Sequence, residues 1–260
     1  MKIAVDIGNL NIVIGVWHQN RFEQVYRIES NAAPSASYYD LRLRQFLLED
    51  NLLHEPIEAV GISSVVPNLL PYWQEVMASF APGIAITVVQ PDIYPLLPVT
   101  TINPAEIGAD LVCNALAAWL RYQSAVIVVD FGTALTFTAV DNNGELAGVA
   151  IAPGIKTALN SLVNSTAKLP EVPLQMPPSI LGRDTTQAMQ AGILLGYEAM
   201  AEGMINRMKK EMGEGVKIIA TGGMAKVLPA LSGYCDEIDG LLTLTGLLAI
   251  DEIVQKGKQD

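Results

Sequence analysis

The chain has 260 residues, of which 50% are hydrophobic and 17% are charged. This composition can form a packed core and excludes an intrinsically disordered protein, and the length allows one large domain or two small ones. The formal net charge of −11 argues against nucleic acid as the main partner, because the phosphate backbone is bound by basic patches.

Two cysteines, Cys113 and Cys235, occur without a Cys-x-x-Cys pair, so neither a disulfide framework nor a zinc cluster is indicated. The N-terminus leads directly into an apolar run, without the pattern of a signal peptide. No apolar stretch approaches the roughly 20 residues that a membrane helix needs. The sequence therefore predicts a soluble cytoplasmic protein with no membrane partner.

The first sixteen residues predict a strand, a tight turn and a returning strand. An apolar run at residues 3–5 ends at the turn-forming group Asp6-Ile7-Gly8-Asn9, and a second apolar run follows at residues 12–16. Such a turn can direct backbone N–H groups at a phosphate while the carboxylate of Asp6 binds a hydrated cation.

A similar pattern follows 124 positions after Asp6, where an apolar run at residues 125–129 leads into Asp130-Phe131-Gly132-Thr133 and then a second run at 135–140. The repeat predicts an internal duplication, with one Asp-x-Gly hairpin in each half. The alternative is two unrelated strand–turn–strand units, since Asp-x-Gly alone is a common sequence. Two hairpins that face each other across a cleft are the way in which actin-like kinases hold nucleotide phosphates.

The rest of the first half alternates strand and helix patterns. A Pro-containing loop is expected at residues 30–37. The predicted elements are a strand at 22–27, a helix at 38–52, a strand at 57–63, a helix at 69–80 and a strand at 84–89. Three strands followed by helix, strand, helix and strand form the ribonuclease-H-like unit of actin-like proteins.

We therefore predict an α/β protein with a duplicated ribonuclease-H-like, actin-like fold. Its two half-domains, 1–115 and 116–260, would surround a nucleotide cleft. Packing of the last helix back on the first half is left open.

A Pro-rich connection at residues 91–107 leads to Gly108-Ala109-Asp110, and a helix is predicted at 111–122. Asp110 thus lies at or near a helix N-terminus. One interpretation is a plain N-cap, for which Asp is favoured. The other is a general base held at the mouth of the cleft.

The second half continues with the same kinds of element and a Pro-containing loop at 165–184. The predicted elements are a strand at 146–151, a helix at 155–164, a long helix at 185–212, a strand at 216–220 and helices at 224–231 and 242–254. Gly222 and Gly223 stand between a strand and a helix. They suit close approach of a nucleotide, or they form a tight connection only.

Seven short motifs occur in order. They are Asp6-Ile7-Gly8-Asn9, Gly108-Ala109-Asp110, Asp130-Phe131-Gly132-Thr133-Ala134, Ala150-Ile151-Ala152-Pro153-Gly154-Ile155, Thr166-Ala167-Lys168-Leu169-Pro170, Gly182-Arg183-Asp184-Thr185 and Ala220-Thr221-Gly222-Gly223. Each is weak alone, but the ordered set is specific, and the chain resembles type III pantothenate kinase (Bvg accessory factor) from end to end. The resemblance implies a homodimer that phosphorylates pantothenate with ATP, Mg²⁺ and a monovalent cation, K⁺ or NH₄⁺, as the first step of coenzyme A synthesis.

The resemblance also assigns roles to residues. The general base falls on Asp110, and the monovalent-cation ligand falls on Asp130. The phosphate-binding hairpin falls on Asp6, Ile7, Gly8, Asn9, Leu10, Asn11, Ile12 and Val13. Further nucleotide contacts fall on Thr133, Gly222 and Gly223. Pantothenate contacts fall on Gly108, Ala109, Asp110, Leu111 and Thr185.

Four positions depart from the family pattern. Leu10 replaces a threonine, Leu111 an arginine, Thr138 an aspartate and Thr101 a tyrosine. Loss of an arginine expected to pair with the pantothenate carboxylate costs roughly 1.5–3 kcal/mol, or about ten- to a hundredfold in affinity.

Other cations could replace the missing arginine. Arg183 and Lys156 are the candidates, each also interpretable as an ordinary surface charge. Two alternative functions stay open. One is a weakened or non-catalytic family member with a binding or regulatory role, and the other is a kinase for a related alcohol without a carboxylate.

Overall fold

The computed structural model describes residues 1–30, 35–101 and 103–257. Part of the predicted loop at 30–37 and Ile102 of the Pro-rich connection lie outside the described residues. Two compact units result: the first comprises Met1–Ala117 together with the chain from Thr243 onward, and the second comprises Ala118–Leu242. The division into halves at residue 115 stays a prediction.

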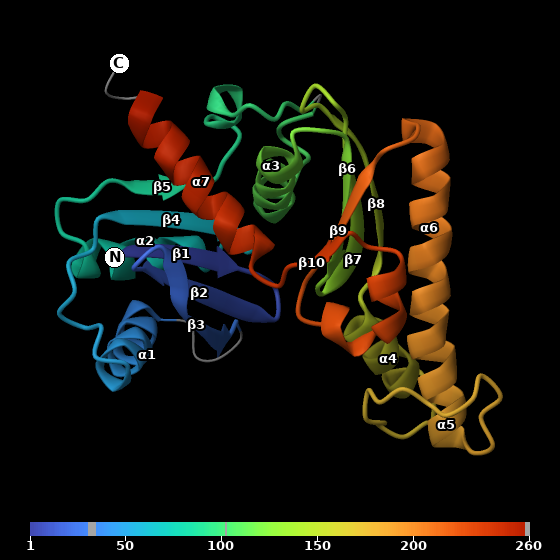
Figure 1. Cartoon of the computed structure of the whole chain (residues 1–260). Coiled ribbons are helices and arrows are strands. Elements are labelled where there is room, and N and C mark those ends of the chain that lie inside the picture. The colour runs from blue at the N-terminus through green and yellow to red at the C-terminus, as the bar shows by residue number, and fades with distance from the viewer. Residues whose placement is uncertain (31–34, 102, 258–260) are drawn as a thin grey trace. The chain divides into compact units, whose positions relative to one another are not determined.

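The first unit contains a five-stranded sheet in the order β3-β2-β1-β4-β5 (Figure 1). Strands β1 to β3 form an antiparallel meander, and β4 and β5 run parallel to β1. The strands are β1 (Lys2–Ile7), β2 (Asn11–His18), β3 (Arg21–Glu29), β4 (Ala59–Ser64) and β5 (Ile86–Val88).

Helices α1 (Ala36–Glu49) and α2 (Leu70–Phe80) pack with the large apolar side chains of this sheet in one buried core. Ile3, Val5 and Ile7 of β1 belong to that core, and they share one face because side chains alternate along a strand.

The opposite face of the first sheet carries small residues at its centre. Gly15, Ala4 and Gly61 lie side by side in the register of β2, β1 and β4. Helix α7 (Leu242–Gly257) packs here, with Leu244 against Gly15 and Leu247 against Gly61. A helix can approach this face closely because the row has almost no side-chain volume.

The second unit repeats the topology of the first. Its sheet has the order β10-β9-β6-β7-β8, with β6 to β8 antiparallel and β9 and β10 parallel to β6. The strands are β6 (Val126–Phe131), β7 (Ala134–Val140), β8 (Leu146–Pro153), β9 (Lys217–Thr221) and β10 (Glu237–Ile238). Both sheets therefore follow one strand order, which confirms the predicted duplicated α/β fold.

Four further α-helices lie within the described residues. Helix α3 (Ala109–Tyr122) carries the chain from the first unit into the second, and α4 (Ile155–Asn164), α5 (Thr185–Gln190) and α6 (Gly196–Met212) belong to the second. A π-helical turn at Ala191–Leu195 joins α5 to α6, so the long predicted helix is almost continuous. Leu194, Tyr197 and Ile205 pack into the core of the second sheet.

The predicted helix at 224–231 is wrong. The structure has two short 3₁₀ segments there, Ala225–Val227 and Pro229–Gly233. Pro229 explains the break, because proline disfavours helical backbone at the residue before it and Leu228 has a ψ angle of 93°. The two-residue strand β10 was not predicted.

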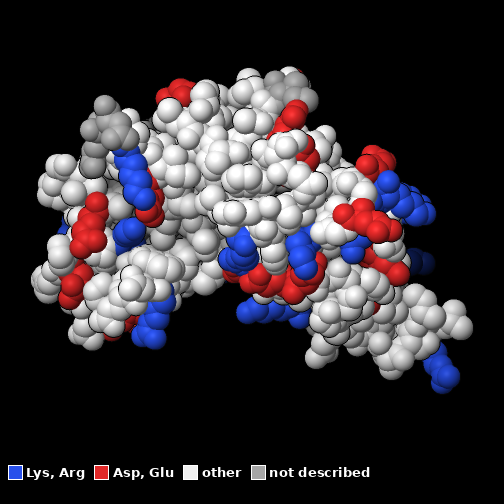
Figure 2. Space-filling view, turned by 45° about the horizontal axis from the view of Figure 1, so that its top comes forward, with Lys and Arg blue, Asp and Glu red and all other residues white. Residues whose placement is uncertain are grey.

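Within the described ranges, no helix combines the length and apolar character needed to cross a bilayer. Figure 2 shows one face of the molecule, on which Lys and Arg side chains stand among Asp and Glu side chains without merging into a continuous basic patch in the part that is described.

Candidate active site

The turn between β1 and β2 is braced by the end of β3. The N–H of Gly8 donates to the carbonyl of Asn11 at 3.0 Å, and the N–H of Ser30 donates to the carbonyl of Leu10 at 3.0 Å. The hydroxyl of Ser30 donates to the carbonyl of Gly8 at 2.5 Å. The carbonyl groups of Gly8 and Leu10 are thus engaged, whereas the N–H groups of the exposed residues Asn9 and Leu10 have no backbone hydrogen-bond partner among the described residues. Such N–H groups can bind a phosphate.

Asp6 is the second-to-last residue of β1, beside the β1–β2 turn. It pairs with Val13 of β2 and with Ser63 of β4. Residues that oppose each other in a ladder share a face of the sheet. Because Asp6 and Ala4 also share a face, Asp6 is on the side of the sheet that α7 covers.

Asp110 lies in the first turn of α3, where its Oδ1 accepts a hydrogen bond from the N–H of Leu111 at 2.8 Å. Burial raises the pKa of the Asp110 carboxyl above its ordinary value, although the backbone hydrogen bonds oppose this shift. Because α3 begins at Ala109, Asp110 is inside the helix, and the N-cap interpretation is wrong.

The buried thiol of Cys113 is influenced by both Asp6 and Asp110. Cys113 follows Asp110 by three positions and therefore lies on the same face of α3. Burial raises the pKa of the Cys113 thiol well above its ordinary value, and the charges of Asp6 and Asp110 both raise it further. Both carboxylates are therefore within electrostatic reach of one buried thiol.

Tyr94 also reaches this region, from a 3₁₀ turn at Tyr94–Leu96. Burial, followed by the neighbouring Cys113 and Asp110, raises the pKa of the Tyr94 hydroxyl to about 12. No sequence pattern indicated Tyr94, because the Pro-rich connection has no periodicity. The helical spacing of Cys113 and Asp110 could have placed Cys113 beside the site.

The two leucines that depart from the family pattern differ in environment. Leu10 is 45% exposed on the β1–β2 turn, whereas Leu111 is only 7% exposed on α3. Gly108 and Ala109 precede Asp110 and Leu111 at the start of α3, and a Cβ on Gly108 would lie 2.5 Å from Oδ1 of Asp110. The structure thus places Gly108 and the N–H of Leu111 against the Asp110 carboxylate.

In the second unit, the turn between β6 and β7 matches the first hairpin. Asp130 opposes Thr136 of β7 and Thr221 of β9, as Asp6 opposes Val13 and Ser63. The carbonyl of Thr133 accepts hydrogen bonds from the N–H of Gly154 at 2.9 Å and from the hydroxyl of Thr157 at 2.7 Å. Thr133 is therefore fixed by the start of α4 while remaining exposed.

Gly222 lies against Asp130. Its φ angle is +90°, and a Cβ at this position would be 2.5 Å from Oδ1 of Asp130. Only glycine combines this backbone conformation with so close an approach. Gly223 is exposed, and a Cβ there would meet nothing within 4 Å.

The donor set suits the cations of a kinase. The hydroxyl of Thr136, opposite Asp130, is buried and has no hydrogen-bond partner among the described residues. Carboxylate and hydroxyl oxygens are ligands for hard cations, and Mg²⁺ usually takes only one or two carboxylates besides substrate phosphates. The described part of the chain has no group of three or more His, Cys, Asp or Glu side chains that could hold a metal ion. A Mg²⁺ ion that is held mainly by substrate phosphates does not need such a group.

Thr185 is the first residue of α5 and is exposed. The side chain of Asp184 caps this helix, with Oδ1 accepting from the N–H of Gln187 at 2.8 Å and Oδ2 from its side-chain amide at 2.9 Å. Lys156 and Arg183, the candidate substitutes for the missing arginine, are also exposed in the second unit.

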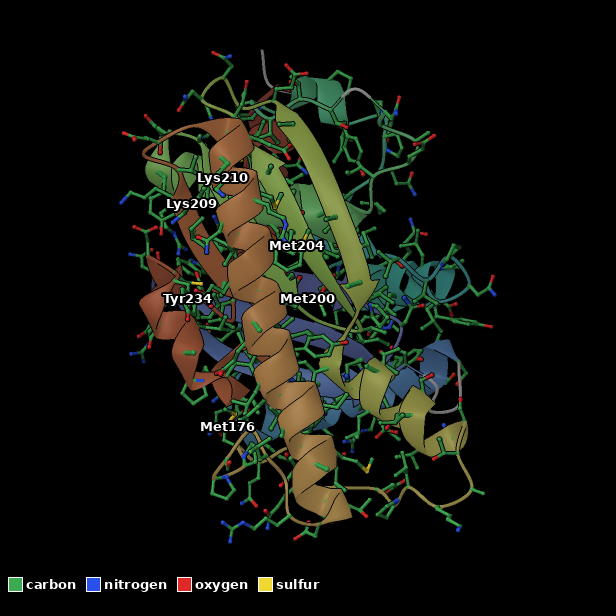
Figure 3. All side chains as sticks on the ribbon, turned by 90° about the vertical axis from the view of Figure 1, so that its right-hand side faces the viewer. Met176, Met200, Met204, Lys209, Lys210 and Tyr234 are labelled. Atoms are coloured by element: carbon green, nitrogen blue, oxygen red, sulfur yellow. The ribbon has the colours of Figure 1, made fainter. Side chains whose placement is uncertain are left out.

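Two hollows of the second unit lie apart from the predicted site residues. One, of about 620 Å³, lies between α6 and the β7–β8 pair and includes Met204 and Met208. The other, of about 810 Å³, lies at the C-terminal end of α6 and includes Lys209 and Lys210. Figure 3 shows both lysines near that end of α6.

Known proteins resemble this chain over almost its whole length. The family model for type III pantothenate kinase matches residues 2–207. The type III pantothenate kinase of Moorella thermoacetica is 39% identical over 252 residues, covering 97% of this chain and 99% of that protein. The same enzyme of Geobacter sp. (strain M21) is 36% identical over 252 residues, with coverage of 97% and 99%.

Solved structures agree in fold. The ethanolamine utilization protein EutJ from Carboxydothermus hydrogenoformans has a TM-score of 0.55 at 16% identity, covering 96% of this chain and 89% of that one. The activator of the 2-hydroxyisocaproyl-CoA dehydratase from Clostridium difficile, solved with bound ADPNP, has a TM-score of 0.50 at 12% identity, covering 100% and 97%. The fold is that of actin-like kinases and ATPases, and by sequence the chain belongs to the type III pantothenate kinase family.

Proposed function

We propose that this chain transfers the γ-phosphoryl group of ATP to pantothenate, giving 4′-phosphopantothenate and ADP as the first step of coenzyme A biosynthesis. Family membership supports the reaction class. The observation that carries the proposal is the partly buried carboxylate of Asp110, whose pKa is raised and which shares one thiol neighbour with Asp6.

In the proposed reaction, Asp110 accepts the proton of the pantothenate primary hydroxyl as its oxygen attacks the γ-phosphorus. The bond between the γ-phosphorus and the bridging oxygen breaks, and ADP leaves with that electron pair. A carboxylate with a raised pKa is a better proton acceptor than an ordinary aspartate at the same pH. Positioning and charge neutralisation supply most of the rate in phosphoryl transfer.

The two hairpins supply the neutralisation. We assign the N–H groups of Asn9 and Leu10 to the ATP phosphates, with Ser30 holding the turn that presents them. Asp6 would hold Mg²⁺ through water or directly, and Mg²⁺ bound to the phosphates would offset their charge. Asp130 and Thr136 would hold the monovalent cation, and Gly222 and Gly223 would approach the nucleotide.

Three further expectations stay proposals. They are the use of K⁺ or NH₄⁺, the homodimer and the cytoplasmic location. Thr185 is proposed as a pantothenate contact, and Lys156 or Arg183 as the cation that meets the pantothenate carboxylate in place of the arginine missing at Leu111.

The test is a coupled assay of ADP release at saturating ATP with added K⁺ or NH₄⁺, on the parent chain and on Asp110→Asn. We expect pantothenate-dependent turnover that falls by about 10²- to 10⁴-fold in Asp110→Asn, the usual contribution of a general base. Parent turnover no higher than that of the variant would reject the proposal. Turnover with pantetheine but not with pantothenate would instead indicate a kinase for an alcohol that lacks a carboxylate.

A further inference from the structure

Helix α7 touches α3 backbone to backbone, one turn after Asp110. The contact is made by Gly246, where an added Cβ would overlap the carbonyl oxygen of Cys113. No other residue type leaves room for this approach, because every other side chain begins with a Cβ. Gly246 therefore sets how closely the two helices can lie.

A second contact lies one turn earlier on α7. The hydroxyl of Thr243 donates a hydrogen bond to Oδ1 of Asn114 at 2.8 Å. Asn114 is only 1% exposed and Thr243 is half-buried, so this bond is partly shielded from water. Thr243 and Gly246 are three positions apart and thus share the face of α7 that meets α3.

The other faces of α7 are fixed to the first sheet. Leu244 and Leu247 pack on Gly15 and Gly61, and α7 crosses β1 and β4 in Figure 1. Oδ1 of the buried Asp251 accepts a hydrogen bond from the hydroxyl of Thr87 on β5 at 2.6 Å. The helix is therefore held to the same sheet whose strand β1 carries Asp6.

Asp110 and Asn114 are four positions apart on a regular helix, so a shift of one moves the other. We propose that Gly246 and Thr243 are positioning residues for the reaction: α7 acts as a spacer that sets the distance between Asp110 and the phosphate-binding turn beside Asp6. The inference rests on the proposed role of Asp110 as general base. Misplacement of a reacting group by about 1 Å can cost about a hundredfold in rate.

The test uses two variants with matched controls. Gly246→Ala forces α7 away from Cys113, and Thr243→Val removes the hydrogen bond without changing side-chain size. Gly257→Ala on the same helix meets nothing within 4 Å, and Thr245→Val changes a hydroxyl that has no hydrogen bond to any described residue. We expect kcat to fall at least tenfold in both test variants, with the KM for ATP within twofold of the parent and both controls close to the parent.

Rescue and coupling separate positioning from general loss of structure. Thr243→Ser retains the hydroxyl and should restore most of kcat, whereas a helix that needs only apolar packing would prefer valine. In an Asp110→Asn background, assayed at high enzyme concentration, Gly246→Ala or Thr243→Val should cause little further loss, because the group they position is gone.

The outcomes distinguish the two proposals. Full activity of Asp110→Asn would overturn the role of Asp110 itself. An unchanged kcat in folded Thr243→Val, or an equal loss in the parent and Asp110→Asn backgrounds, would overturn the spacer role alone. If Gly246→Ala does not fold, Thr243→Val and Thr243→Ser still decide the question, because neither introduces a new Cβ.

Discussion

At the scale of single residues, the environment of Asp110 distinguishes it from a structural cap. A capping aspartate sits before the helix and bonds to an N–H two or three positions later. Asp110 instead lies inside α3 and bonds to the adjacent N–H of Leu111. Its partial burial disfavours the charged form and raises its pKa, and raised carboxyl pKa values are typical of functional sites.

The raised pKa of Asp110 predicts the pH dependence of the reaction. The base must be deprotonated, so kcat/KM should fall as the pH drops through the raised pKa, which lies above the ordinary aspartate value of about 4. The neighbouring Tyr94, with a pKa near 12, and Cys113, with a pKa well above the ordinary thiol value, both stay neutral over this range. The charge of Asp6 also acts on Cys113 and so belongs to the same region.

A profile of kcat/KM for pantothenate between about pH 4 and pH 8 checks this prediction. Asp110→Asn should retain low activity with the acid limb removed. An acid limb at the ordinary aspartate value in the parent, or an unchanged limb in the variant, would contradict it.

Leu111 predicts a measurable gain from a single substitution. Leu111→Arg restores the family guanidinium next to the base, and a charged hydrogen bond to the pantothenate carboxylate contributes roughly 1.5–3 kcal/mol. The KM for pantothenate should therefore fall about ten- to a hundredfold. Because Leu111 is only 7% exposed, the unliganded variant should also have a lower Tm, which pantothenate raises again.

Leu111→Met is the control, because it keeps apolar volume without a charge. A folded Leu111→Arg variant with an unchanged KM would show that another cation already meets the carboxylate. Arg183→Ala and Lys156→Ala would then identify it by the loss of pantothenate affinity.

At the scale of elements, the two Asp-x-Gly hairpins are copies in register as well as in sequence. Asp6 is paired with Ser63 across the parallel ladder, and Asp130 is paired with Thr221 in the same way. The turns differ by one residue, since Ile7 pairs with Ile12 but Phe131 pairs with Leu135. The duplication thus preserves the position of each carboxylate and changes the length of the backbone beside it.

Gly222 and Gly223 give a matched pair of substitutions on the β9 turn. Gly222→Ala strains a backbone at φ +90° and places a Cβ 2.5 Å from Asp130, so it should displace that carboxylate. We expect activity to fall at least tenfold and the K⁺ concentration for half-activation to rise, because Asp130 is the proposed cation ligand. A Cβ on Gly223 does not touch Asp130, so Gly223→Ala should keep the K⁺ concentration for half-activation of the parent, whatever its effect on the KM for ATP.

Titration of activity with K⁺ in both variants checks this prediction. Equal K⁺ dependence in Gly222→Ala and Gly223→Ala would argue against Asp130 as the ligand.

The sequence predicted most elements because their signals are local. The apolar runs and the Asp-x-Gly turns place the hairpins, and the fold follows from their repetition. Contacts between residues far apart in the sequence have no such local signal. The roles of Ser30, Tyr94 and Gly246 are therefore visible only in the folded structure. The 3₁₀ segments after Met224 were missed for a different reason: apolar spacing suited a helix, and Pro229 overrode it.

At the scale of the whole molecule, the chain leaves the first unit once and returns to it. Helix α3 carries the chain out, and α7 brings it back. The second unit is continuous in sequence, and the described residues of its main core lie between Ala125 and Ile238. The first unit, by contrast, depends on a helix encoded more than a hundred positions after its last strand.

This asymmetry predicts different behaviour of the two units when they are expressed apart. The segment 118–242 should unfold cooperatively on its own, because its sheet and core are complete. The segment 1–117 leaves the face of Gly15 and Gly61 uncovered and should bind a hydrophobic dye and melt without a sharp transition.

A peptide of residues 243–257 is too short to be a stable helix in water. Mixed with 1–117 it should gain helical circular dichroism and restore a cooperative transition, whereas the same peptide with Leu247→Asp should not, because a charge would be buried against Gly61. A cooperative transition in 1–117 alone, unchanged by the peptide, would show that α7 covers the sheet without stabilising it.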